Sequence, residues 1–232
     1  MRLNFYLHLH KIKLMNSLTE ENYLKIIYKL LESADVVHTN DIARKAQTRA
    51  ASVTDMLRKL AAKKYINYRK YNGLTLTPEG KKVALNIIRK HRLWEMFLVE
   101  KLGFSWDEVH DVAEQLEHIH SDKLIDQVEK SLNYPRFDPH GDPIPDRNGK
   151  ITPQKSILLS HLRKNESCLM SGVIDHSKQF LQHLDRLGIA LGNEIKIKEV
   201  VDYDKSLYLV VNKKTTLYIS SDVARNILVT KQ

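Results

Sequence analysis

Histidine and carboxylate side chains recur at one-turn spacing in the middle of the chain. His91 and Glu95 are four residues apart, and further along Glu114, Glu117 and His118 follow the same spacing. On a helix, residues three or four apart lie on one face, so each group would present its donors together. Imidazole and carboxylate ligands suit Mn²⁺ or Fe²⁺, although affinity order alone favours zinc, nickel or copper. The spacing therefore predicts a metal-binding region.

Further donors lie outside these two groups. His110 precedes the second group by one turn, and the segment FDPHGDPIPD adds Asp138 and His140. The C-terminal part adds Asp175, His176 and Gln179. A single His/Glu pair is more often a surface ion pair, and DPHGDP by itself is an ordinary turn-rich loop. Several such residues on consecutive helices favour the metal site.

Positive charge is concentrated in one segment. The chain of 232 residues carries a formal net charge of +9, and from Asp41 to Lys70 there are nine Lys/Arg against two acids. Such a balance favours an anionic partner.

The elements of this basic segment follow one another as helix, turn, helix and hairpin. An amphipathic helix over 19–33 precedes a short helix that Thr39 or Asn40 can cap. After a break at 47–50, Val53, Met56, Leu57 and Leu60 mark a third helix with one buried face. Two alternating runs, 65–70 and 74–77, surround Asn72-Gly73, which is a strong hairpin signal. The unit is typical of a winged helix-turn-helix.

A recognition helix of this kind enters the DNA major groove, where small polar side chains at its start reach base edges and Lys or Arg neutralise phosphates. A solvated basic face on a helical bundle is the simpler alternative. The candidate DNA contacts are Thr39, Arg49, Ala51, Ser52, Thr54, Asp55, Arg58, Lys59, Lys63, Lys70 and Tyr71.

The remaining chain is predicted as helices followed by a small β domain. Thr77-Pro78 begins a helix that runs to about Leu102, a capping box at 105–108 opens another to about His120, and a short helix spans 122–132. The segment 133–150 holds four of the six prolines and is a linker or loop. A helix over 177–187 lies among β-rich runs at 193–201, 207–212 and 215–219, which fits an SH3-like barrel.

The predicted fold class is mainly α with a small β domain. We expect a tail at 1–14, a winged helix-turn-helix at 15–78, a helical dimerisation and metal-binding domain with a proline-rich linker at 79–150, and an SH3-like (FeoA-like) domain at 151–232. A single cysteine, Cys168, excludes an internal disulfide and fits the reducing cytoplasm. No apolar run approaches the length of a membrane-spanning helix, so no membrane partner is expected.

From about Leu18 to its end, the chain resembles the diphtheria-toxin-repressor and manganese-transport-regulator family. The stretches that carry the resemblance are RKHRLWE (89–95), VHDVAEQLEH (109–118), FDPHGDPIP (137–145) and DHSKQFLQHLDRLG (175–188). The resemblance implies a winged helix, a helical dimerisation domain with two metal sites, and an SH3-like domain.

One metal site implied by the resemblance contains Glu114, Glu117 and His118, completed from the first helix at the position of Asn22. The manganese branch usually carries Asp there. Small manganese members have a second acid where this chain has Lys25, so their two-metal arrangement is not expected.

The other implied site contains His91, Glu95 and His110. The streptococcal-type branch adds residues that match Asp138, His140 and Asp175, while Gln179 falls where other long members place a ligand. Glu114 stands where iron-responsive members have Cys. This hard oxygen ligand favours Mn²⁺ as the cofactor, with Fe²⁺ and Zn²⁺ as alternatives.

The resulting hypothesis is a homodimeric, metal-dependent repressor that binds a pseudo-palindromic operator on double-stranded DNA, before metal-uptake genes. Two alternatives stay open. A metal-dependent hydrolase would use the same ligands to activate water, although the chain has no HExxH motif and no phosphate-cradling glycine loop. A DNA-binding protein whose metal is merely structural would bind its operator without added metal.

Overall fold

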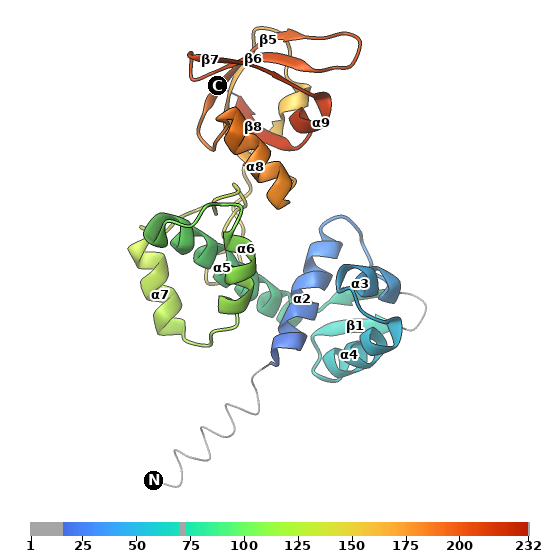
Figure 1. Ribbon diagram of the computed structural model, residues 1–232. Helices are drawn as coiled ribbons and strands as arrows, with labels where there is room; N and C mark the ends of the chain where they lie inside the picture. The colour runs from blue at the N-terminus through green and yellow to red at the C-terminus, as the bar shows by residue number, and fades with distance from the viewer. Residues whose placement is uncertain (1–15, 70–72, 232) are drawn as a thin grey trace. The chain divides into compact units, whose positions relative to one another are not determined.

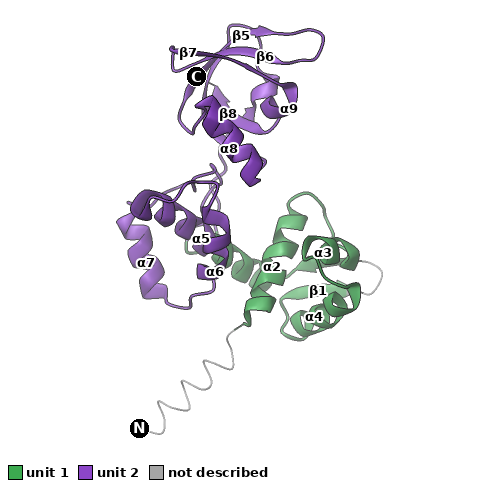
Figure 2. Ribbon diagram, in the orientation of Figure 1, with its two compact units in different colours: residues 1–89, 147–149 green, residues 90–146, 150–232 purple. Residues whose placement is uncertain are grey.

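The structure is a computed structural model that describes residues 16–69 and 73–231. The chain divides into two compact units (Figure 2): Met1–Arg89 with 147–149, and Lys90–Asp146 with 150–232. Among the described residues, no helix is long and apolar enough to cross a bilayer.

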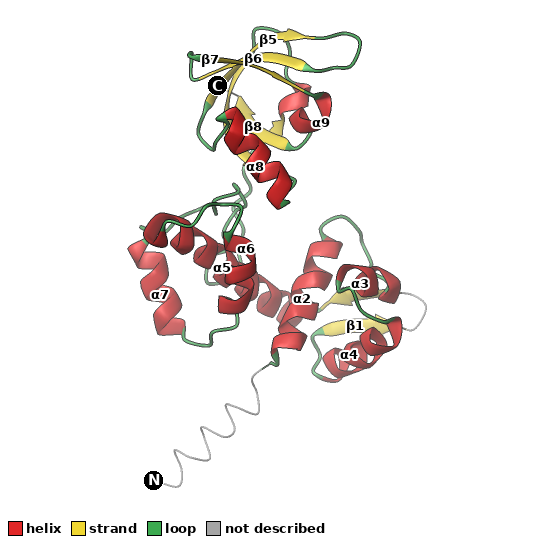
Figure 3. Cartoon of the chain, in the orientation of Figure 1, coloured by secondary structure: helices red, strands yellow, loops and turns green. Residues whose placement is uncertain are grey.

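The described part of the first unit contains helices α2, α3 and α4, a hairpin and the start of α5 (Pro78–Leu102) (Figures 1 and 3). The bounds of the other elements are α2 Leu18–Leu31, α3 Thr39–Lys45, α4 Ala50–Ala62, β1 Ile66–Arg69 and β2 Gly73–Leu76. Val53, Leu57 and Leu60 of α4 are fully buried together with Leu24 and Ile27 of α2. The predicted apolar stripes thus form one core, which leaves the opposite face of α4 to solvent.

Local hydrogen bonds set the helix starts in this unit. Ser17 and Glu20 form a capping box on α2, with the Ser17 hydroxyl accepting from Glu20 N at 3.2 Å and the Glu20 carboxylate accepting from Ser17 N at 2.8 Å. The predicted cap of α3 was wrong by one or two residues. His38 is the N-cap, and its N–H donates to the Asp41 carboxylate at 3.4 Å, so Thr39 is already helical.

The predicted wing is confirmed. Strands β1 and β2 pair antiparallel, with Ile66 opposite Leu76 and Arg69 opposite Gly73. Lys70 and Tyr71 lie outside the described residues.

Helix α5 (Pro78–Leu102) begins in the first unit and continues into the second. Thr77 caps it as predicted, because its hydroxyl accepts from Gly80 N at 3.1 Å. The capping box predicted at 105–108 was wrong. The Ser105 hydroxyl instead donates to the carboxylates of Asp107 and Glu108, and α6 is shorter than expected, Val109–Leu116.

The second unit packs these helices around a core of their own. Helix α7 (Asp122–Ser131) supplies Ile125 and Val128, which pack in one cluster with Leu93, Leu98 and Val109. The following segment, 133–150, is irregular apart from an isolated bridge between Phe137 and Pro143. This segment carries Asp138 and His140.

The C-terminal part is a small β domain with a helix, in agreement with the predicted SH3-like architecture. The described strands form an antiparallel sheet in the order β3-β8-β4-β5-β6-β7. Their bounds are β3 Ile157–Leu158, β4 Ser167–Val173, β5 Glu194–Val200, β6 Leu207–Val211, β7 Thr215–Ile219 and β8 Ile227–Lys231. The helical segments are η1 Leu159–His161, α8 Lys178–Leu187 and α9 Ser221–Ala224. The sequence indicated α8 and β5 to β7, but it missed β3, β4 and β8.

Candidate functional site

Helices α5 and α6 bring three predicted ligands together. His91 Nε2 lies 3.0 Å from Glu95 Oε1, and His110 Nδ1 lies 3.3 Å from the same oxygen. His91 and Glu95 are only 6% and 3% exposed, whereas His110 lies nearer the surface. The one-turn spacing on α5 therefore aims both side chains at a single point, which α6 closes with His110.

The irregular segment adds a second set of donors to the same carboxylate. Glu95, Asp138 and His140 are all buried, and one donor atom from each lies within 4.8 Å of the others, as is also true of His91, Glu95 and His110. Glu95 belongs to both sets. We call these five residues the Glu95 cluster.

A tight turn holds Asp138 in this position. Its Oδ1 accepts from His140 N at 2.8 Å and from Asp142 N at 2.9 Å. Its other oxygen, Oδ2, lies 3.5 Å from Arg92 Nε, and Arg92 also binds the Asp142 carboxylate at 2.8 Å. The aspartate therefore organises the loop with Oδ1, while its Oδ2 lies beside the Arg92 guanidinium.

The pKa values of the two buried carboxyl groups of the cluster are shifted in opposite directions. Burial alone would raise the pKa of Glu95, but hydrogen bonds from His110 and His91 hold that pKa below its ordinary value. Burial raises the pKa of Asp138 well above its usual range, and the neighbouring Glu95 and Asp142 charges act in the same direction. Further positive charge at the cluster would favour ionisation of both carboxyl groups.

The donor atoms fit a divalent cation. His140 Nε2 donates to the Trp106 carbonyl oxygen at 2.9 Å, so in the neutral ring Nδ1 carries the lone pair. This Nδ1 is buried without a hydrogen-bond partner, and the nearest carboxylate, Glu95 Oε2, is 3.8 Å away. A buried nitrogen lone pair beside two carboxylates is what a metal ion would satisfy.

The second predicted site is joined to the cluster through one hydrogen bond. His91 Nδ1 donates to Glu117 Oε2 at 2.6 Å, while the other Glu117 oxygen lies 3.5 Å from His118 Nε2. Glu117 is fully buried, and the Glu114 side chain is 51% exposed. The two ring nitrogens of His91 therefore face different predicted sites: Nε2 faces Glu95 and Nδ1 faces Glu117.

The other predicted ligands lie elsewhere. Asp175 Oδ1 accepts from Ser177 N at 2.8 Å just before α8, and Gln179 is exposed on α8. Asp175 joins neither of the His and carboxylate groups found among the described residues, and the role of Gln179 as a ligand stays a prediction. Asn22 is exposed on α2, in the first unit, and its role as a ligand stays a prediction.

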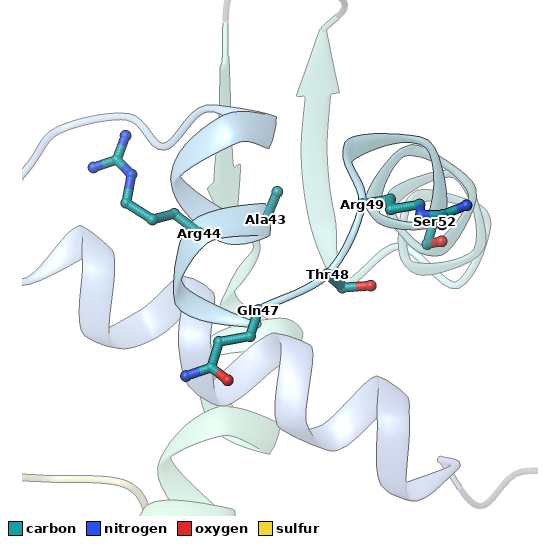
Figure 4. A pocket seen from close by; sticks show the side chains of 6 residues that line it. All are labelled: Ala43, Arg44, Gln47, Thr48, Arg49 and Ser52. Carbon is teal, nitrogen blue, oxygen red and sulfur yellow. The ribbon is translucent and has the colours of Figure 1, made fainter.

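The start of α4 presents the predicted DNA contacts to solvent. Arg49 is the N-cap of α4, and Ala51, Ser52, Asp55 and Lys59 are exposed. A groove of about 670 Å³ lies beside the turn between α3 and α4 (Figure 4). It is lined by Ala43, Arg44, Gln47, Thr48, Arg49 and Ser52.

The candidate contacts did not include Arg44, Gln47 and Thr48, which also line the groove. Gln47 and Thr48 stand in the predicted break between the two helices, which was the available signal, whereas Arg44 lies on α3. Two predicted phosphate contacts already have acidic partners. Lys63 Nζ lies 2.8 Å from Glu20, and Arg58 lies 3.2 Å from Asp55.

Two further predicted DNA contacts, Thr39 and Thr54, are partly buried. Thr39 is half-buried at the start of α3, and the Thr54 hydroxyl donates to the Ala50 carbonyl at 3.0 Å. Whether any of these residues touches DNA stays a prediction.

Three family models match successive parts of the chain. Residues 15–74 match the N-terminal DNA-binding domain of iron-dependent repressors, residues 77–146 their metal-binding and dimerisation domain, and residues 157–231 the FeoA domain.

Individual proteins agree with these matches. The HTH-type transcriptional regulator MntR of Oceanobacillus iheyensis is 37% identical over 114 residues, 49% of this chain and 77% of that protein. The iron-dependent repressor IdeR of Mycobacterium leprae is 34% identical over 133 residues, 56% of this chain and 58% of its own length. A solved manganese-dependent transcriptional repressor in complex with manganese superposes with a TM-score of 0.82 at 32% identity, covering 91% of this chain and 99% of that one.

Proposed function

The chain belongs to the diphtheria-toxin-repressor and manganese-transport-regulator family of metal-dependent DNA-binding repressors, and on this basis we propose that Mn²⁺ is its effector. The family consists of transcriptional repressors and not enzymes, so the hydrolase alternative loses its support. A metal cofactor is common to the manganese- and iron-dependent relatives.

The observation that carries the proposal is the buried Glu95 cluster. Its residues supply imidazole nitrogens and carboxylate oxygens, and the nearby predicted site of Glu114, Glu117 and His118 supplies the same types. The only thiol, Cys168, is buried in the core of the C-terminal domain. Hard oxygen donors without a thiolate favour Mn²⁺, with Fe²⁺ next and Zn²⁺ as the remaining alternative.

In the proposed mechanism, a metal ion held by the Glu95 cluster would supply positive charge that favours the ionised forms of Glu95 and Asp138. Helices α5 and α6 position the donor side chains, and α4 presents its basic face to DNA. Metal activates the protein only if it binds the DNA-competent arrangement more tightly than other arrangements. Asn22 on α2 is proposed as a further ligand; Asn22→Ala should then weaken metal-dependent DNA binding without unfolding the protein.

The family dimerises, and we propose that this chain acts as a homodimer. A two-fold dimer with two recognition helices reads a pseudo-palindromic operator, since each helix enters one half-site of the major groove. The proposed target genes are those for metal uptake. The role places the protein in the cytoplasm, where it meets DNA.

Fluorescence anisotropy of a labelled upstream DNA fragment tests the proposal. Chelator-stripped protein is titrated at fixed salt with Mn²⁺, Fe²⁺ or Zn²⁺ in separate series. We expect tight binding with Mn²⁺ and weak binding without metal. His140→Ala serves as a matched variant that should require more Mn²⁺. Equal binding with and without metal would reduce the Glu95 cluster to a structural role, and tighter binding at lower free Fe²⁺ or Zn²⁺ would reassign the effector.

A further inference from the structure

The imidazole of His140 stacks with two aromatic rings. Its centroid lies 4.8 Å from that of His176, with 20° between the planes, and 6.0 Å from that of Trp106, with 13° between the planes. These are stacked geometries. The ring also donates from Nε2 to the Trp106 carbonyl oxygen, and in this orientation its Nδ1 lies 3.8 Å from Glu95 Oε2.

The C-terminal domain supplies or supports each part of this arrangement. Asp185 of α8 accepts from the Trp106 indole N–H, with both carboxylate oxygens 3.0 Å from Nε1. Val173 N, at the end of β4, donates to the His140 carbonyl at 3.0 Å. Next to Trp106, the Asp107 carboxylate accepts from the side-chain amide of Gln182 of α8 at 2.8 Å.

His176 is itself oriented by β4. Its Nε2 lies 3.4 Å from the Val173 carbonyl oxygen, so this nitrogen points at the backbone. His176 also belongs to neither donor group found among the described residues. The ring therefore contributes its face to His140.

We propose that the SH3-like domain positions a metal ligand without donating one: His176 and Trp106 form a stacked clamp that fixes the direction of His140 Nδ1 toward Glu95 and Asp138. His176 is thus a positioning residue, and Asp185 supports the clamp through Trp106. The inference rests on the proposed metal-dependent function. The physical basis of the proposal is that mutating a residue that orients a metal ligand commonly lowers metal affinity by about 10- to 100-fold.

Mn²⁺ binding to the full chain tests the clamp directly, because free Mn²⁺ is counted by electron paramagnetic resonance without reference to DNA. His140→Ala identifies which binding step belongs to the Glu95 cluster. His176→Ala should weaken that step by about tenfold, whereas His176→Phe, which keeps an aromatic face but has no nitrogen, should stay close to the unmodified chain. His183→Ala, the same change at an exposed histidine of α8, should have no effect.

The outcomes separate positioning from ligation. If His176→Phe binds Mn²⁺ as weakly as His176→Ala, the histidine nitrogen is needed and the clamp is overturned. If His176→Ala binds like the unmodified chain, stacking has no role and the clamp is also overturned. Failure of the unmodified chain to bind Mn²⁺ would instead reject the proposed function.

A second variant addresses the support from α8. Asp185→Ala removes the acceptor of the Trp106 indole while leaving His140 and His176 in place. We expect the same Mn²⁺ step to weaken, by less than in His176→Ala, with an unchanged far-ultraviolet circular dichroism spectrum. An unaltered titration would remove Asp185 from the clamp and contradict its stated role.

Discussion

His91 is the residue through which the two predicted metal sites are linked. Its Nε2 lies 3.0 Å from Glu95, and its Nδ1 donates to Glu117 at 2.6 Å. Sequence spacing put His91 and Glu117 in separate groups, and the family resemblance implied a separate metal site for each group. Position along a helix does not reveal which ring nitrogen faces which neighbour, so the hydrogen bond between them was not predicted. In the folded chain, a carboxylate of one predicted site is hydrogen-bonded to a predicted ligand of the other, an arrangement that orients the imidazole ring.

Glu117→Gln should therefore weaken metal binding at both sites. Glutamine keeps the size of the side chain but replaces the charge-assisted bond to His91 with a weaker neutral one. We expect about a tenfold loss at the Glu95 cluster in addition to the loss at the Glu117 site, measured by Mn²⁺ titration. Asp111→Asn, at an exposed carboxylate of α6, is the matched control. An unchanged Glu95-cluster step in Glu117→Gln would show that the bond to His91 carries no coupling.

Cys168 provides a prediction about pH. The thiol is fully buried, and burial raises its pKa from 9.0 to about 12, with the Glu166 charge acting in the same direction. The folded state thus favours the protonated thiol, whose contribution to stability is complete below pH 9.0 and is lost as pH rises toward about 12. The native protein should stay unreactive to a thiol reagent between pH 7 and about 9, and denaturant should release one reactive thiol per chain. Rapid labelling of the native protein would contradict this.

At the scale of elements, the sequence predicted what local periodicity and caps determine. Helices α2, α4, α5 and α8 and the wing follow from apolar spacing and turn residues. Strands β4 and β8 were missed because they pair with each other across the domain, and β4 contains Ser171 and Gly172, which weaken an alternating pattern. The sequence also indicated which residues could be metal donors. It did not indicate that they come together around Glu95, because that depends on how the 138–142 loop packs against β4.

Gly141 makes that meeting possible. Its φ is +89°, and a Cβ at this position would lie 2.1 Å from the Ser171 carbonyl oxygen of β4. Gly141→Ala should destabilise the protein by more than about 1 kcal/mol and weaken Mn²⁺ binding at the Glu95 cluster, as measured by denaturant unfolding and metal titration. Gly103→Ala is the control, because Gly103 has φ +71° but nothing within 4 Å of the added Cβ. Equal effects of the two substitutions would mean that backbone strain alone, and not the contact with β4, is responsible.

At the scale of the whole molecule, the two units carry different chemistry. The exposed basic face of α4 belongs to the first unit, whereas every member of the Glu95 cluster belongs to the second. Phosphate contacts release counterions and so determine how DNA affinity depends on salt. Under the proposed function, the metal ligands would set the Mn²⁺ concentration that is needed for DNA binding. The two dependences should therefore be separable by mutation.

Lys59→Ala and His140→Ala test this separation. Lys59 is exposed on α4, so its loss should reduce the slope of log K against log salt by about one unit for each phosphate that it contacts, with the Mn²⁺ requirement unchanged. His140→Ala should raise the Mn²⁺ requirement and, at saturating metal, leave the salt slope as it was. Lys198→Ala, which removes the same charge from an exposed position of β5, controls for net charge. Anisotropy titrations at several salt concentrations give both quantities. A shifted Mn²⁺ requirement in Lys59→Ala would show that the basic face and the metal cluster are not independent, because a residue with no donor role would then change metal affinity at the Glu95 cluster.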